Sequence, residues 1–167
     1  MDGLRWTGFE SAAPELAAKG RALLTNFGVG LGYLATVRKD GGPRVHPFCP
    51  VFHNGGVYGL ILPGSPKCWD LQRDGRFAVH AFPLEDRDDE FYFTGRVARC
   101  DVEVDAVRAA FLSQADTTTS SGDEICFEFL VERALLAEYP KRGEGPGWPP
   151  AYTKWTLADR NSGAVDS

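Results

Sequence analysis

The chain has 167 residues, a length that fits one domain, and its hydrophobic content of 43% and charged content of 25% are those of an ordinary globular protein. No apolar run approaches the ~20 residues of a membrane-spanning helix, and the net charge of −5 argues against nucleic acid as a partner. The first ten residues lack the basic and apolar segments of a secretory signal, so we expect a cytoplasmic protein with a single domain over 1–167.

The N-terminal third combines a helical segment, within 1–30, with three strands. Ser11 is the expected N-cap of an amphipathic helix over roughly 12–26. Two glycine-rich turns then separate three expected strands, which cover 31–37, 45–52 and 57–62. Pro47 and Pro50 interrupt the second strand, so it should lie at a sheet edge or carry bulges. The pattern predicts an antiparallel meander.

The rest of the chain predicts a short helix ending near Arg73, further strands and a second amphipathic helix capped by Asp101. The further strands are expected over 77–82, 91–100, 126–137 and 152–157. Polar or Gly/Pro-rich segments at 117–122 and 140–150 are expected loops, and 158–167 is expected to be a disordered tail. This order predicts a mainly β protein, a closed or nearly closed antiparallel barrel of six or seven strands with two or three peripheral helices.

The segment Ile61-Leu62-Pro63-Gly64-Ser65-Pro66-Lys67 is the most informative for function. A strand ends, a turn follows, and a helix begins with Ser65 at the cap and Pro66 at its first position. The first turn of a helix attracts anions, and Lys67 adds a full positive charge that suits a phosphate. A capped surface helix with a solvated lysine is the alternative that these residues leave open.

Arg44 and His46 share one face of the preceding strand, where both could reach a phosphate beside Lys67. Taken alone, Arg44 is equally well explained as an exposed surface arginine. His46 alone is equally well explained as a histidine hydrogen-bonded to a backbone carbonyl. The three histidines lack metal-ligand spacing, so no metal site is expected. Neither a nucleophile motif nor a dinucleotide fingerprint is present.

Taken together, these motifs resemble the pyridoxamine 5′-phosphate oxidase-like FMN-binding split β-barrels, and their order covers residues 31 to about 100. The motifs are Leu34-Ala35-Thr36-Val37, Asp40-Gly41, Pro43-Arg44-Val45-His46-Pro47, Val57-Tyr58-Gly59-Leu60, Ser65-Pro66-Lys67, Asp70-Leu71, Arg76-Phe77-Ala78-Val79 and Phe93-Thr94-Gly95-Arg96-Val97. The resemblance implies a Greek-key split barrel that works as a homodimer, with FMN at the subunit interface.

The resemblance also implies roles for individual residues. A lysine after the third strand holds the FMN phosphate in the family, and Lys67 occupies that place with Ser65 two residues earlier. A basic residue of the second strand assists it, and His46 falls there, where arginine is more usual. The complete set of implied cofactor-binding residues is Thr36, Arg44, His46, Pro47, Ile61, Leu62, Ser65 and Lys67.

The expected function is an FMN-dependent oxidoreductase that exchanges hydride with a small molecule, because the flavin would supply the reactive group that the chain itself lacks. No arginine-rich C-terminal segment follows Trp155, so vitamin B6 is not the expected substrate. The 140–150 loop with Trp148 is the expected substrate-pocket element. The alternatives are a deazaflavin-dependent reductase, a non-enzymatic flavin or haem binder, and a barrel without cofactor.

Overall fold

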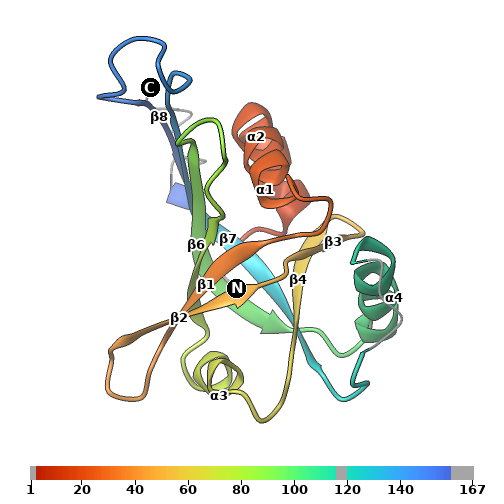
Figure 1. The fold of residues 1–167 in the computed structure, drawn as a ribbon. Helices are drawn as coiled ribbons and strands as arrows, with labels where there is room; N and C mark the ends of the chain where they lie inside the picture. Colours follow the sequence, from red (N-terminus) through yellow and green to blue (C-terminus); the bar gives the residue numbers. More distant parts are fainter. Residues whose placement is uncertain (1–2, 116–119, 159–167) are drawn as a thin grey trace.

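The computed structural model describes residues 3–115 and 120–158, and they form one curled antiparallel sheet with helices around it (Figure 1). The eight strands are β1 (Gly32–Val37), β2 (Pro43–Phe48), β3 (Val51–His53), β4 (Gly56–Ile61), β5 (Arg76–Ala81), β6 (Glu90–Arg99), β7 (Ile125–Glu138) and β8 (Ala151–Thr156). The four helices are α1 (Trp6–Ala12), α2 (Pro14–Leu24), α3 (Pro66–Arg73) and α4 (Val104–Gln114).

The strands follow the order β2-β1-β5-β6-β7-β4-β3, and β8 pairs with β7 beside this path. The two ends of the path, β2 and β3, are joined by only Cys49 and Pro50. The sheet must therefore curl until its two ends approach each other, which produces a split β-barrel and confirms the predicted fold class.

This arrangement corrects the predicted meander. The strand expected over 45–52 breaks at Cys49-Pro50 into β2, which pairs with β1, and β3, which pairs with β4. Because proline cannot donate a hydrogen bond to a ladder, the chain leaves one edge of the sheet here and joins the other. The break raises the number of strands to eight, above the predicted six or seven.

The N-terminal helix is also different from the prediction. Two helices, α1 and α2, meet at Ala13-Pro14, and Ser11 lies within α1, where its hydroxyl donates to the Thr7 carbonyl at 2.9 Å. Pro14 has no N–H to donate, so it begins a second helix and cannot continue the first. Helix α4 likewise begins two residues later than Asp101 suggests, with Glu103 at its N-cap.

The core at the end of the barrel covered by α1 and α2 is aromatic. Trp6 is 1% exposed, and its ring centroid lies 5.0 Å from that of Phe52, 5.2 Å from that of Phe9 and 5.6 Å from that of Phe93. Edge-to-face contacts of this kind stabilise beyond the area they bury. Leu4 ties the chain before α1 to the sheet by two backbone hydrogen bonds with Val131.

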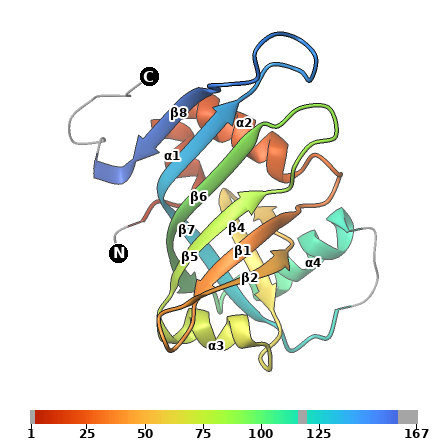
Figure 2. The same ribbon diagram turned by 60° about the vertical axis from the view of Figure 1, so that its left-hand side comes forward.

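Helix α3 lies below the barrel in Figure 1, at the end away from α1 and α2, and α4 lies beside β3 and β4. Figure 2 turns β2, β1 and β5 toward the reader, and none of the helices formed by the described residues crosses their outer face. No helix among the described residues is long and apolar enough to cross a membrane. Two expectations fall outside the described residues. They are the disordered tail, of which residues 159–167 are not described, and residues 117–119 of the expected polar loop.

Candidate functional site

The turn before α3 places Lys67 as the sequence predicts. Ser65 is the N-cap and Pro66 the first helical residue, and the Ser65 hydroxyl donates to the Leu62 carbonyl at 2.9 Å. The hydroxyl therefore closes the turn, leaving the first-turn N–H groups of the helix without a side-chain cap. Proline at the first position fixes a helical φ, which aims the next side chain, that of Lys67, back toward β2.

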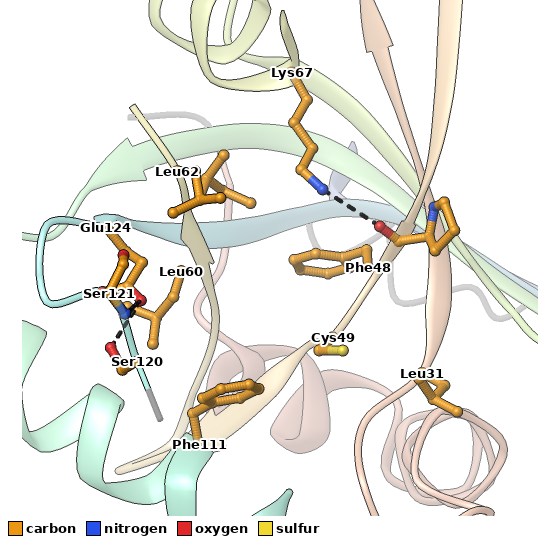
Figure 3. Close-up of a pocket in the computed structure, with 12 residues that line it drawn as sticks. Leu31, Phe48, Cys49, Leu60, Leu62, Lys67, Phe111, Ser120, Ser121 and Glu124 are labelled. Carbon is orange, nitrogen blue, oxygen red and sulfur yellow. Dashed lines mark hydrogen bonds between the residues drawn. The ribbon is translucent and has the colours of Figure 1, made fainter. Parts of the chain in front are cut away.

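Lys67 reaches a pocket of about 630 Å³, which falls in the range of roughly 300–1,000 Å³ typical of small-molecule sites (Figure 3). The pocket gathers residues from β2, β4, α3, α4 and the segments before β1 and β7. They are Leu31, Pro47, Phe48, Cys49, Leu60, Ile61, Leu62, Lys67, Phe111, Ser120, Ser121 and Glu124. The walls are mostly apolar, with polar groups at two places.

The first polar place is the Lys67 ammonium, which is half-buried. It donates to the Pro47 carbonyl at 3.4 Å, a long contact, and within the described part of the chain it has no carboxylate partner. Burial lowers the pKa of Lys67 because a charged group loses hydration there. The lysine is therefore a cation that lacks a counter-charge at the wall of an apolar pocket.

The second polar place is Glu124, across the pocket from Lys67 in Figure 3. Its carboxylate accepts hydrogen bonds from the Ser120 hydroxyl at 2.7 Å and the Ser121 backbone N–H at 2.9 Å, and from Arg108 at 3.2 Å. Burial alone would raise the pKa of Glu124, but the hydrogen bonds from Ser120, Ser121 and the backbone outweigh it and hold the pKa at about 2. Glu124 is thus ionised and already satisfied, so an anionic ligand would place its charge at the Lys67 end.

Four of the eight residues that the sequence marks as cofactor-binding line this pocket: Pro47, Ile61, Leu62 and Lys67. Ser65 does not line the pocket, but its hydrogen bond to the Leu62 carbonyl closes the turn that precedes Lys67. Phe48, Cys49, Leu60 and Phe111 are pocket residues that the sequence did not reveal. Their apolar or small side chains are typical of a hydrophobic core. Only the closure of the barrel brings α4 and the start of β7 to the Lys67 pocket.

Thr36 and Arg44 contact Asp70 of α3. The Thr36 hydroxyl donates to Asp70 Oδ2 at 2.9 Å, Arg44 Nε donates to the same oxygen at 2.8 Å, and Arg73 Nη2 donates to Oδ1 at 3.1 Å. Asp70 is only 3% exposed, so this network is what allows its charge to be buried. Thr36 and Arg44 thereby hold α3 against the barrel.

His46 is close enough to the Lys67 ammonium and to the Arg44–Asp70 pair for their charges to act on its pKa. Its Nε2 is a buried polar atom without a hydrogen-bond partner among the described residues. Burial lowers the pKa of His46, and the positive charges of Lys67 and Arg44 lower it further. The charge of Asp70 raises this pKa, but burial and the two cations together outweigh it.

The 140–150 loop does not reach this pocket within one protomer. It joins β7 to β8 at the end of the molecule away from α3 (Figure 1), and Trp148 is 71% exposed. The expectation that this loop forms part of the substrate pocket therefore receives no support from the single chain.

The fold and the pocket define a split β-barrel protein with a site of cofactor size beside α3. No family model matches the chain, and no curated protein sequence matches it significantly. Among solved structures, the chain is similar to a haem-binding protein from Mycobacterium smegmatis, with a TM-score of 0.63 and 18% identity over 87% of this chain. It spans 60% of the length of that protein.

Two further structures share the fold. An F420 reductase matches 62% of this chain and 87% of its own, with a TM-score of 0.53 and 16% identity. A protein from Listeria innocua, provisionally named a pyridoxamine 5′-phosphate oxidase, matches 70% of this chain and 94% of its own, with a TM-score of 0.55 and 18% identity. At these identities the likeness shows the split-barrel fold, which agrees with the fold that the resemblance implied.

Proposed function

We propose that this protein binds FMN in the Lys67 pocket and works as a flavin-dependent oxidoreductase on a small molecule. The observation that carries the proposal is the half-buried Lys67 ammonium, which faces an apolar pocket of about 630 Å³ without a carboxylate partner among the described residues. A cation in this position is matched by a phosphate, which forms charge-assisted hydrogen bonds. Solved split barrels named for an oxidase and an F420 reductase support the same class of chemistry.

The residues in and beside the pocket fit both the phosphate and the ring system of FMN. Lys67 would hold the phosphate, with the unsatisfied His46 Nε2 close by. Phe48, Leu60 and Phe111 would exclude water around the ring system, and the end of β4 at Ile61 and Leu62 would border it. The bound flavin supplies hydride transfer, while the chain binds it, orients it and keeps the pocket dry.

Haem is less well supported as the occupant. A haem iron needs an axial ligand, which in most haem proteins is a histidine. Within the described residues no histidine lines the pocket, whose nearest soft ligand is the Cys49 thiol. A deazaflavin has a longer acidic tail than FMN, so it would also need cations outside the Lys67 pocket.

A homodimer completes the proposal, and we place its interface on the outer face of β1, β2 and β5. That face presents Val45, which is 60% exposed, and Tyr33, which stacks on Phe82 with 4.4 Å between ring centroids. Pro47 lies opposite Tyr33 on this face and also lines the pocket. A second copy seated there would therefore border the cofactor, which explains why the pocket is open in one chain.

The cofactor is tested by an absorption spectrum and by titration calorimetry with FMN. Lys67→Ala should weaken FMN binding by about tenfold or more, because a charge-assisted contact contributes roughly 1.5–3 kcal/mol. Lys141→Ala removes an exposed lysine of the 140–150 loop and is the matched control. Equal FMN affinity in both variants, or a pure protein that binds no FMN, would reject the proposal.

The interface is tested by analytical ultracentrifugation. Val45→Lys places a charge in the centre of the proposed interface and should shift the dimer toward monomer. Val102→Lys makes the same substitution at a valine that is 96% exposed and should leave the mass unchanged. A monomeric parent protein, or a Val45→Lys dimer of unchanged stability, contradicts this interface.

A further inference from the structure

A second pocket lies on another side of α3. It has a volume of about 540 Å³ and is built from the β1–β2 turn, the start of β2 and α3. Its lining residues are Arg38, Lys39, Asp40, Arg44, Trp69, Asp70 and Arg73. Trp69 follows Lys67 by two positions, which turns its side chain by roughly 200° around the helix axis. The two pockets are therefore separated by the body of α3 and share no lining residue.

This pocket is positively charged although the protein as a whole is acidic. Four cationic side chains line it against two carboxylates, which gives a formal charge of +2 in a chain whose net charge is −5. Arg38 pairs with Asp40 at 2.9 Å. Lys39 has neither a hydrogen bond nor an ion pair with any described residue. The cations of the pocket therefore exceed what its two carboxylates can neutralise.

Two arginines of this pocket, Arg44 and Arg73, are held in place by the buried carboxylate of Asp70. Buried Asp70 binds Arg44 through Nε and Arg73 through Nη2. Neither nitrogen Nη1 nor Nη2 of Arg44 has another partner in the described part of the chain, and the same holds for Nε and Nη1 of Arg73. The side chains are one-third exposed, so their remaining donors are accessible to a ligand. A fixed guanidinium fork of this kind suits the oxygens of a phosphate.

Beside these cations, Trp69 offers an aromatic surface on which a planar group of a ligand could stack. Its indole is 55% exposed on α3, beside the cations, and it makes no ring contact within the described residues. An exposed tryptophan face stacks on planar rings, nucleobases included. The volume exceeds what a lone phosphate needs and leaves room for such a ring.

We propose that this pocket binds a nucleoside phosphate, with the base on Trp69 and the phosphates on Lys39, Arg38, Arg44 and Arg73. The site is independent of the cofactor proposed for the Lys67 pocket. It gives the protein a place for a nucleotide, or for the nucleotide half of a larger substrate, within one helix width of the Lys67 pocket.

Binding is tested with adenosine 5′-diphosphate as the probe, by calorimetry and by quenching of tryptophan fluorescence. Trp69→Ala should weaken binding roughly fivefold or more through the loss of stacking, and should abolish most of the quenching. Lys39→Ala should weaken binding as well and reduce its dependence on salt. Trp148→Ala and Lys141→Ala, at exposed positions of the 140–150 loop, are the matched controls and should bind as the parent protein does.

Two comparisons identify the ligand chemistry. Adenosine, which lacks phosphate, and pyrophosphate, which lacks the ring, should each bind much more weakly than the diphosphate. Equal binding of pyrophosphate would overturn the nucleotide assignment in favour of a bare anion site. Equal binding of adenosine would overturn the role of the cations.

The two sites are separated by titrating the diphosphate into protein that carries one equivalent of FMN. Its affinity should be unchanged, and Lys67→Ala should also leave it unchanged while weakening FMN. If the diphosphate binds and FMN does not, the cofactor proposal fails and this one stands. If FMN binds and the diphosphate does not, or if one equivalent of FMN displaces it, the second site does not exist.

Discussion

The two ends of the barrel are stabilised in different ways. Under α1 and α2 the core is a cluster of aromatic rings centred on Trp6, which is buried on all sides. At α3 the interior holds a carboxylate, Asp70, bound by two arginines and a threonine. The aromatic cluster stabilises the fold through buried area and ring contacts, whereas the Asp70 network also positions charged groups next to two pockets.

This difference suggests that the end covered by α1 and α2 serves stability, whereas the end at α3 serves ligand binding. A folded core needs no half-buried lysine, no unpaired histidine nitrogen and no exposed tryptophan, and all three occur at the α3 end. Substitutions at the aromatic end should therefore lower stability without changing ligand affinity. Substitutions at the α3 end should change affinity, pH dependence, or both.

The largest expected effect is that of Trp6→Ala. Removing a fully buried tryptophan costs roughly 3–5 kcal/mol, because the surrounding rings cannot close the cavity. Urea unfolding should show this loss, while Trp148→Ala, at an exposed tryptophan, should stay within about 0.5 kcal/mol of the parent. A drop in FMN affinity in folded Trp6→Ala protein would show that the two ends are coupled after all.

Asp70→Asn should have the next largest effect. It leaves Arg44 and Arg73 without their anionic partner, and a loss of roughly 1–3 kcal/mol is expected because both arginines are partly hydrated. Burial raises the pKa of Asp70, but its hydrogen bonds with Arg44, Thr36 and Arg73 lower it more, so the net pKa lies below the usual value.

A depressed carboxylate pKa stabilises the fold at pH values above the unfolded pKa of ~3.9, and this stabilisation is lost as the pH falls through the folded pKa. The stability difference between the parent protein and Asp70→Asn should therefore be full at pH 7 and shrink below pH ~4. Asp101→Asn, which breaks an exposed pair with Arg99, is the control and should change stability little at either pH. A difference that does not vary with pH would mean that Asp70 acts through packing alone.

The sequence predicted the strands well because local signals mark them. Asn54-Gly55 forms the turn before β4 with positive φ at both residues, +43° and +73°. The start of α3 was also recovered, since Ser65-Pro66 is a local helix signal. The break at Cys49-Pro50 was missed because apolar residues continue across it. Each half forms a hairpin with its neighbour in sequence, β2 with β1 and β3 with β4, so only the course of the whole sheet shows that the two halves lie at opposite ends of it.

The candidate site was recovered in part for the same reason. Lys67, Ile61 and Leu62 lie in one continuous segment that local chemistry singles out. The opposite wall, with Phe111 and Glu124, depends on where α4 and β7 pack, and no local pattern encodes that. Asp70 entered only through the Asp70-Leu71 motif of the resemblance and Trp69 was not singled out, because nothing in the sequence shows that one is buried and the other exposed.

The smallest expected effect concerns His46 and the pH dependence of stability. Its pKa is lowered in the folded protein by burial and by the charges of Lys67 and Arg44, so the unfolded chain takes up a proton first. The parent protein should therefore lose stability as the pH falls through the unfolded histidine pKa of ~6.5, until the folded pKa is reached. His46→Gln should remove this part of the slope between pH 7.5 and 5.5, and His53→Gln on β3 serves as the control.

The same measurement sharpens the comparison of the two ends when it is repeated with FMN. A phosphate held by Lys67 would place negative charge beside His46 and offset the two cations that lower its pKa. The slope attributable to His46 should then be smaller in FMN-loaded protein than in the free protein. An identical slope with and without FMN would place the bound phosphate away from His46, and with it away from the Lys67 end of the pocket.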